Sequence, residues 1–259
     1  DISICDDDND GVNSFDFIAD VTPTVLATQD PLSFSVTYHP TQEDADANTA
    51  AYPNPYSNVL TQESVFVRIE NVENTTCFDT TSFTIEVFET PVVAAINDLQ
   101  NCDDGTDGDL TNGQTQTDLS ALTAVVLGSQ DTTLFNVSYH LDIADAEAGA
   151  NPLPLSYYNT TAFNQTLLVR IENTTNTDCY ATQEFTVIVN TTPTANAVSD
   201  ISICDDDNDG INSFDFITDV TPTVLATQDP LGFSVTYHPT QEDADANTAA
   251  SVSYTHLRA

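Results

Sequence analysis

An internal repeat limits the possible folds of this chain more than any other feature of its sequence. Residues 1–51 and 200–250 align without a gap. The aligned residues differ only at Val12/Ile211, Ala19/Thr218 and Ser33/Gly232. A diverged copy lies between them, so the period is about 100 residues, the size of a small domain rather than of one solenoid turn. We therefore expect three domains, at residues 1–92, 93–193 and 194–250, and the third is truncated.

The middle copy is identified by residues that recur in the same order along the chain. Its counterparts of Cys5, Phe34, Tyr38, His39, Arg68, Cys77 and Pro91 are Cys102, Phe135, Tyr139, His140, Arg170, Cys179 and Pro193. Short segments that contain Thr and Pro, FETPVV and VNTTPTAN, join the copies without a long spacer. Each copy is therefore expected to have the neighbouring repeats of the same chain as partners.

Residues 251–259 break the repeat abruptly. Residue 51 is followed by YPNPY, whereas residue 250 is followed by SVSYTHLRA. The letters VSYTHLRA resemble the translation of a transposon-type sequencing-library adapter, and the alternative is genuine divergence. We interpret the chain as a metagenomic fragment and exclude this tail from the argument about fold and function, as for any sequence scar.

Alternation of apolar and polar residues predicts strands in every copy. Phe34, Val36 and Tyr38 alternate with polar residues, and the segments at 65–70, 83–87 and 185–189 repeat the pattern. Such segments, rich in β-branched and aromatic residues, are typical of half-buried strands. About seven strands per copy predict an all-β chain of tandem immunoglobulin-like antiparallel β-sandwich domains. A single helical turn is expected within residues 42–51.

The charge of the chain excludes several classes of partner. There are 41 acidic residues against 3 basic ones, and the formal net charge is -38. Such a surface repels nucleic acid and anionic lipid, and no apolar run is long enough to span a membrane. It favours divalent cations. The expected further partner is an unknown surface ligand, a glycan or a protein.

The histidines and arginines give little support for catalysis. His39, His140 and His238 each follow a Tyr at the end of an expected strand, and no Ser or Cys nucleophile accompanies them at a recognisable spacing. We expect structural histidines, no catalytic residues and no enzyme activity. Arg68 and Arg170 are expected to form ion pairs with neighbours on the same strand face. The neighbours concerned are Glu70 and Glu172.

Acidic loops are the best candidates for a metal site. In the first copy, Asp6, Asp8 and Asp10 alternate before Gly11, as in the first half of a calcium-binding loop, but Phe17 replaces the bidentate Glu. The nearest further carboxylate, Asp16, lies on an expected strand. The other candidate ligands are Asp103, Asp107, Asp109, Asp205, Asp207, Asp209 and Asp215. An acidic turn without metal is the alternative. Ca²⁺ is favoured, because carboxylates so close together would otherwise repel one another.

The five cysteines predict disulfides, since no Cys-x₂-Cys pair suggests zinc. The favoured pairs lie within copies, Cys5–Cys77 and Cys102–Cys179, and leave Cys204 without a partner. The reasoning is that the first and last strands of such a sandwich run parallel and would bring each pair to one pole. The alternatives are pairs between copies, Cys77–Cys102 and Cys179–Cys204, or reduced thiols in the core. Disulfides would indicate an oxidising, extracellular setting.

Three blocks carry a resemblance to a known family: CDDDNDG followed by FDF, then VTYHPTQEDADA, then VFVRIEN with TTCFDTTSFTIEV. Together they resemble a repeat of large secreted proteins from Bacteroidota, especially marine flavobacteria, which end in a gliding-motility-associated C-terminal domain with a type IX secretion signal. The resemblance implies export to the cell surface and a role in adhesion or as a stalk. We expect a stalk or adhesin stiffened by Ca²⁺. The alternative is an array of glycan-binding modules attached to an enzyme or adhesin elsewhere in the chain.

Overall fold

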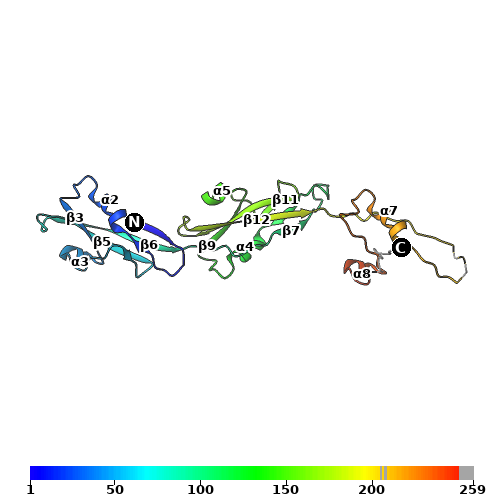
Figure 1. Ribbon diagram of the computed structural model, residues 1–259, viewed down its shortest axis with the longest axis horizontal. Coiled ribbons are helices and arrows are strands. Elements are labelled where there is room, and N and C mark those ends of the chain that lie inside the picture. The colour runs from blue at the N-terminus through cyan, green and yellow to red at the C-terminus, as the bar shows by residue number, and fades with distance from the viewer. Residues whose placement is uncertain (205, 207–208, 251–259) are drawn as a thin grey trace. The chain divides into compact units, whose positions relative to one another are not determined.

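The structure is a computed structural model that describes residues 1–204, 206 and 209–250 (Figure 1). The tail at 251–259 lies outside the described residues, so its interpretation as an adapter sequence stays a prediction. By its internal contacts the chain divides into two units. One contains Asp1–Asn101 and Gln116–Ile188, and the other contains Cys102–Thr115 and the chain from Val189 onward.

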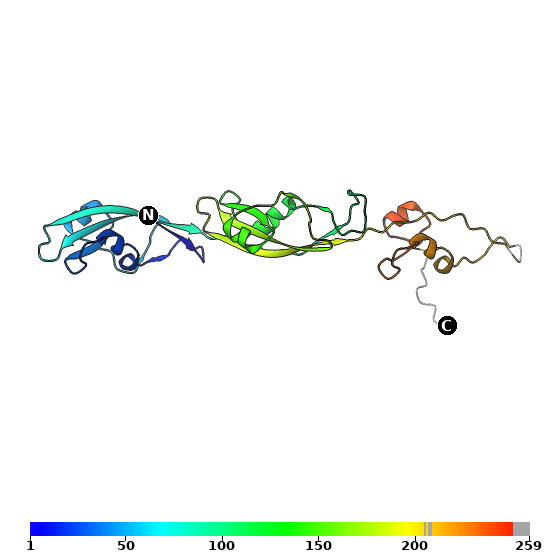
Figure 2. The ribbon, with the colours of Figure 1, turned by 90° about the horizontal axis from the view of Figure 1, so that it is seen from above.

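The first repeat contains six strands and three short helices. Their bounds are β1 Ile2–Asp6, β2 Ser14–Phe15, α1 Phe17–Asp20, α2 Thr22–Leu26, β3 Phe34–His39, α3 Gln42–Ala47, β4 Tyr56–Ser57, β5 Gln62–Asn71 and β6 Phe78–Glu89. The main sheet has the order β1-β6-β5-β3, and β2 pairs with β4 in a second, small sheet. Figure 2 shows the long strands of the main sheet as curved ribbons. Among the strand pairs of the main sheet, β1 and β6 run parallel, as expected, and the others antiparallel.

Side chains from both sheets and from α1 form the core of this repeat. The buried residues of the core cluster are Phe15, Phe17, Tyr38, Tyr56, Val65, Val67, Ile85 and Val87. Val65 and Val67 come from β5, and Ile85 and Val87 from β6, at the alternate positions that the sequence pattern predicts. The expected all-β fold of tandem β-sandwich domains is therefore confirmed, although the strands are fewer than the seven expected.

Helices α1 and α2 occupy a segment for which a strand was expected around Asp16. Asp16 is instead the N-cap of α1, where its Oδ1 accepts a hydrogen bond from Ala19 N at 3.0 Å. Pro23 lies in the first turn of α2, where its missing N–H and fixed φ are tolerated. Helix α3 lies within residues 42–51, where a helical turn was expected. Thr41 caps it, because its side chain accepts a hydrogen bond from Asp44 N at 3.1 Å. It contacts β3 and β5.

The second repeat has the same order of elements. Its bounds are β7 Leu99–Cys102, β8 Gln116–Asp118, α4 Ser120–Leu127, β9 Phe135–His140, α5 Ile143–Ala148, β10 Ser156–Tyr158, β11 Asn164–Asn173 and β12 Tyr180–Asn190. Its sheets, β7-β12-β11-β9 and β10-β8, correspond to those of the first repeat. One longer helix, α4, replaces the two short helices α1 and α2.

The third repeat retains only helices: α6 Phe216–Asp219, α7 Thr221–Leu225 and α8 Gln241–Asp245. Its described residues form no strand, although they include counterparts of β1 and β3. The reason is that those strands pair with β6 and β5 in the first repeat, and residues 200–250 contain no counterpart of β5 or β6. Across the described residues, no helix has the length and apolar character needed to cross a membrane.

Candidate functional site

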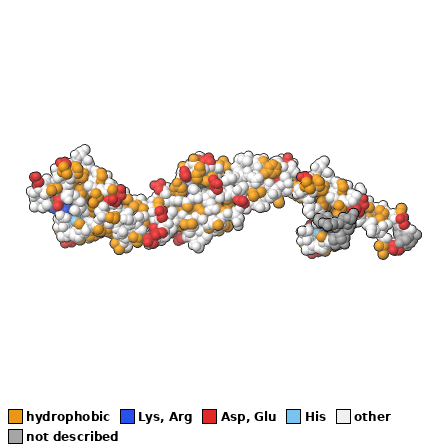
Figure 3. Space-filling model, in the orientation of Figure 1, with side chains coloured by type: hydrophobic (Ala, Val, Ile, Leu, Met, Phe, Trp, Pro, Cys, Tyr) orange, Lys and Arg blue, Asp and Glu red, His pale blue; other side chains and the backbone are white. Residues whose placement is uncertain are grey.

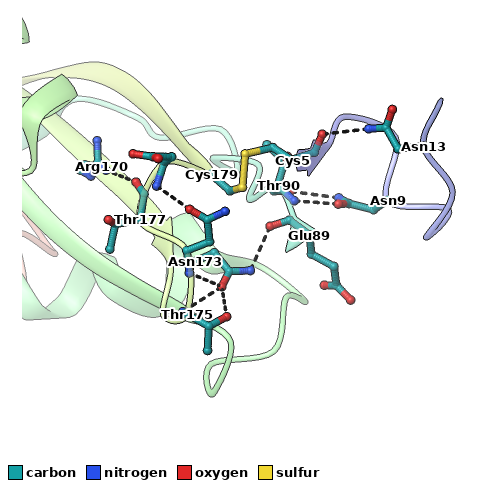
Figure 4. The surroundings of a disulfide bond; sticks show 12 residues. Cys5, Asn9, Asn13, Glu89, Thr90, Arg170, Asn173, Thr175, Thr177 and Cys179 are labelled. Atoms are coloured by element: carbon teal, nitrogen blue, oxygen red, sulfur yellow. Dashed lines mark hydrogen bonds between the residues drawn. A yellow bond between two sulfur atoms is a disulfide. The ribbon is translucent and has the colours of Figure 1, made fainter. Parts of the chain in front are cut away.

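A disulfide joins the first repeat to the second (Figure 4). It links Cys5, in β1, to Cys179, just before β12, with an S–S distance of 2.02 Å and a Cα–Cα distance of 5.4 Å. The two residues are 174 positions apart in the sequence. The remaining cysteines, Cys77, Cys102 and Cys204, are free and exposed within the described part of the chain.

The expected pairs Cys5–Cys77 and Cys102–Cys179 are therefore wrong, and so are the alternatives Cys77–Cys102 and Cys179–Cys204. The parallel direction of β1 and β6 explains the error. The end of β1 lies beside the end of β6, so Cys5 lies opposite Phe88, whereas Cys77 precedes the first residue of β6. At about 3.3 Å per residue, the length of β6 separates the two cysteines. Cys5 thus lies where the chain leaves the first repeat.

Backbone and side-chain hydrogen bonds surround this disulfide (Figure 4). Asn9 and Thr90 form a reciprocal pair: Asn9 Nδ2 donates to Thr90 O at 3.0 Å, and Thr90 N donates to Asn9 Oδ1 at 2.8 Å. Across the junction, Asn173 Nδ2 donates to Glu89 O at 3.1 Å. The hairpin that carries Cys179 is therefore hydrogen-bonded to the last residue of β6 as well as linked by the disulfide.

A buried arginine holds the Cys179 hairpin in place. Arg170 Nε pairs with Glu172 at 2.7 Å, and its Nη2 donates to Thr177 O at 2.6 Å. Its Nη1 donates to Ala146 O and Glu147 O at 2.9 and 2.8 Å. The guanidinium thus connects the C-terminal end of α5 to the hairpin between β11 and β12.

The first repeat contains the same arrangement around Arg68. Its Nε pairs with Glu70 at 2.7 Å, so the expected ion pairs are confirmed in both repeats. Its Nη groups donate to Ala45 O, Asp46 O and Thr75 O at 3.1, 3.0 and 2.8 Å. Figure 3 shows many acidic side chains on the face drawn and little basic surface. This fits the burial of both arginines, which are 4% and 3% exposed.

The linker between the repeats is held by a glutamine that the sequence did not suggest. Gln130 Oε1 accepts from Val92 N at 2.8 Å, and Gln130 Nε2 donates to Val92 O at 2.6 Å. Two residues further on, Ala94 N donates to Val126 O at 2.9 Å. Gln29 and Gln228 occupy the matching positions of the other repeats, and this recurrence was the available signal.

The first acidic loop brings three predicted ligands together. Oxygen atoms of Asp6, Asp8 and Asp10 lie within 4.8 Å of one another. Asp6 is buried, and its carboxylate accepts hydrogen bonds from Asn9 N at 3.1 Å and Gly11 N at 2.6 Å. The pKa of Asp8 is raised, first by a hydrogen bond shared with Asp6 and also by the charge of Asp10. Gly11 has φ +81°, which favours glycine at this turn.

Asp16 lies outside this cluster, at the cap of α1. There Asn54 Nδ2 donates to its Oδ1 at 2.7 Å, and this bond, with that from Ala19 N, lowers the pKa of Asp16. Asp215 caps α6 in the same way, and hydrogen bonds from Thr218 lower its pKa.

The other acidic loops differ from the first. Asp103 is buried and accepts from Gly113 N at 2.8 Å, whereas Asp107 and Asp109 accept bonds within their own turns. In the described part of the second repeat, these three carboxylates form no cluster like that of the first. Asp209 accepts from Ile211 N at 2.7 Å. The predicted ligands Asp205 and Asp207 lie outside the described residues.

The histidines have structural contacts. His39 is fully buried, its Nδ1 donates to Thr49 O at 2.7 Å, and its Nε2 lies 2.8 Å from Thr37 Oγ1. His140 makes the same contacts with Ala150 O and Ser138 Oγ, each at 2.8 Å. Both ring nitrogens are therefore engaged in holding the segment after α3 or α5 against the sheet, as expected of a structural histidine.

Comparisons with known proteins agree with this junction. The model of a family described as the Flavobacterium inter-domain disulphide bond domain matches residues 1–91, 98–193 and 200–258. A search of curated proteins finds no match. Among solved structures, the cadherin-like domains 1 to 4 of zebrafish RET are 13% identical and cover 67% of this chain, with a TM-score of 0.18. The match spans 44% of that structure, less than half its length.

Proposed function

The chain belongs to the Flavobacterium inter-domain disulphide bond domain family, and from this premise we propose that it is part of a surface stalk or adhesin whose successive domains are joined by disulfides. The repeated family domain and the Cys5–Cys179 bond indicate an extracellular or surface protein. Type IX secretion, a gliding-motility-associated C-terminal domain and the absence of catalysis are part of the proposal.

The disulfide between repeats is the observation that carries this proposal. A pull along the chain reaches Cys5 after a few residues and then passes through the sulfur atoms to Cys179. The stretch of chain between these cysteines, which are 174 positions apart, therefore carries none of the load. A stalk built in this way keeps its length under tension, because its domains cannot be drawn out into extended chain.

The free cysteines extend the same scheme to other copies. Cys102 and Cys204 match Cys5, and Cys77 matches Cys179. All three are exposed and therefore accessible to a cysteine of another copy. We therefore assign each of them a disulfide with the neighbouring copy on its own side in the parent protein.

A Ca²⁺ ion in the first acidic loop is a further part of the proposal. Asp6, Asp8 and Asp10 can each offer one oxygen within a small volume, and hard oxygen ligands suit this ion. The loop also contains Asn9, which binds Thr90 at the start of the linker. An ion held there would order the loop and, through Asn9, stiffen the junction.

Single-molecule force extension of the full chain tests the load path. With the disulfide intact, complete extension should leave the stretch between Cys5 and Cys179 untouched. After reduction, the same chain should gain about 600 Å of contour length, from 174 residues at about 3.5 Å each.

Two variants serve as controls for this measurement. Cys5→Ser should give the longer contour without reductant, and Cys102→Ser should behave as the unmodified protein, because Cys102 is free. If the oxidised, unmodified chain extends to the same length as the reduced one, no bridge carries the load and the proposed stalk loses its mechanism.

A further inference from the structure

The contact between linker and glutamine occurs twice in the chain with different linker residues. In the second repeat, Gln130 pairs with both backbone groups of Val92. In the third, Gln228 Oε1 accepts from Thr194 N at 2.8 Å and Gln228 Nε2 donates to Thr194 O at 2.6 Å. The glutamine side chain thus binds the backbone of the linker. The contact therefore does not depend on whether the linker residue is Val or Thr.

A second backbone contact accompanies each glutamine. Ala94 N donates to Val126 O at 2.9 Å, and Asn196 N donates to Val224 O at 3.2 Å. Here too the linker residue differs, Ala in one case and Asn in the other, while the acceptor is the same Val position of the following repeat.

The first repeat carries the same surface without a linker on it. Its members are Val25, Gln29, Asn71 and Cys77, which we call the acceptor surface. Gln29 is exposed, and no described residue forms a hydrogen bond with its side chain.

Comparison with the second repeat shows what a linker covers. Val25 and Asn71 are half-buried and Cys77 is exposed. Their counterparts in the second repeat are Val126 at 0%, Asn173 at 5% and Cys179 at 1% exposure.

Two backbone turns of the acceptor surface already have the conformation seen in the second repeat. Gln29 N donates to Leu26 O at 2.8 Å, as Gln130 N does to Leu127 O at 3.1 Å. Asn71 N donates to Cys77 O at 3.0 Å, as Asn173 N does to Cys179 O at 2.9 Å. Binding therefore requires no rearrangement of these two turns, which lowers its entropic cost.

We propose that the acceptor surface of the first repeat binds the last strand and linker of another copy of this domain, and that Gln29 holds that linker by its backbone. This inference rests on the proposed function, since the occupant is the preceding domain of a disulfide-joined stalk. It adds the surface and the glutamine that bring the linker into register, so that any copy with a Thr- or Val-containing linker fits.

An extended protein provides the test. A second copy of residues 98–199 is placed directly before Asp1, which reproduces the natural junction between residues 199 and 200 because Asp1 and Asp200 are matching positions. Amide hydrogen exchange is then measured at the added copy of Thr194. This amide should be protected, and Gln29→Leu should raise its exchange rate about tenfold, the effect of losing one backbone-type hydrogen bond.

Matched variants of the 259-residue chain separate this effect from misfolding. In this chain, Gln29→Leu should change neither the exchange rate of the Val92 amide nor the stability of the protein, because Gln29 is exposed and has no linker to bind. Gln130→Leu should raise the exchange of Val92 about tenfold.

Exchange at the added Thr194 that is equally fast with Gln29 and with Leu overturns the proposal. A non-reducing peptide map reports separately on the proposed function, through a bond between the added Cys102 and Cys77. If the Cys102–Cys77 bond forms but the added Thr194 amide is unprotected, only the acceptor surface is rejected. If the bond does not form, the disulfide-joined stalk is rejected.

Discussion

At the scale of single residues, one position shows how the repeats differ in backbone strain. Ala27 has φ 51° and ψ -106°, and Ala226 in the third repeat has φ 48°. The matching residue of the second repeat is Gly128, with φ 58°. Residues with a Cβ rarely adopt this conformation, whereas glycine adopts it without a steric penalty.

Ala27→Gly should therefore stabilise the first repeat by about 1 kcal/mol, as measured by urea denaturation. Ala19→Gly, at an exposed position within α1, is the matched control and should destabilise, because glycine is a poor helix former. A loss of stability for Ala27→Gly as large as that for Ala19→Gly would contradict the assignment of strain.

Predictability from sequence also varied residue by residue. The ion pairs of Arg68 and Arg170 could be predicted, because a strand places residues two apart on one face. The expected partner of Cys5 was wrong because parallel strands place the end of β1 beside the end of β6, far from Cys77 at its start. The true partner, Cys179, could not be predicted, because it depends on how two repeats meet, which the strand pattern does not contain. Gln130 was missed because a single glutamine in a loop carries no signal, and its recurrence as Gln29 and Gln228 was not used.

At the scale of elements, the buried arginines join a helix to a hairpin. Arg68 contacts the carbonyl groups at the end of α3 and Thr75 O in the hairpin before β6, and it pairs with Glu70. Its guanidinium lies 3.6 Å from the ring centroid of Phe78. A lysine ammonium cannot make these contacts together, because it lacks the planar fork of donors.

Arg68→Lys should lower the free energy of unfolding of the first repeat by about 2–4 kcal/mol, since Glu70 and three carbonyl groups lose partners in a buried setting. Urea denaturation measures the change. Glu73→Gln, at an exposed hairpin position, is the control and should have little effect. Equal stability of Arg68→Lys and the unmodified protein would show that the contacts of Arg68 do not stabilise the first repeat.

The elements themselves were predictable to different degrees. Strands β3, β5 and β6 could be placed because their alternation is long and regular. Helices α1 and α2 were missed because each spans less than two turns, too short for a helical period to show, and because Phe15 and Phe17 fit a strand pattern equally well. In the structure, Phe17 is the first residue of α1, and its ring lies 4.9 Å from that of Tyr38 and 5.7 Å from that of Tyr56, between ring centroids.

At the scale of the whole molecule, the junction combines a covalent bond, a hydrogen-bonded hairpin and a bound linker. Within one unit, the disulfide, Asn173 and Gln130 all hold the end of the first repeat to the second. The acidic loop adds a fourth contact through Asn9 and Thr90. The acidic loop and the two cysteines were located from sequence, although the cysteines were paired wrongly. The contacts of Asn173 and Gln130 were not, because they depend on the fold.

The fourth contact makes the junction sensitive to Ca²⁺ if the proposed ion binds. Asp8 has a raised pKa because it faces Asp6 and Asp10, so a cation would relieve the repulsion that opposes its charged form. Asn9 has φ 56° and lies between two of these carboxylates. Ordering of the loop by an ion therefore fixes Asn9, which in turn fixes the Thr90 amide at 2.8 Å from its Oδ1.

We expect 10 mM Ca²⁺ to slow hydrogen exchange of the Thr90 amide by about 10–100-fold, given affinities of roughly 10⁻⁴–10⁻³ M for a loop without the bidentate Glu. Asp8→Asn should abolish the effect and be no less stable in chelator, because it removes a repelled carboxylate. Asp7→Asn, which alters the same loop outside the cluster, should retain it. Thr90 exchange that is the same with Ca²⁺ and with chelator in the unmodified protein would leave the loop as a hydrogen-bonded acidic turn, and the stiffness of the junction would then come from the disulfide, the hairpin and Gln130 alone.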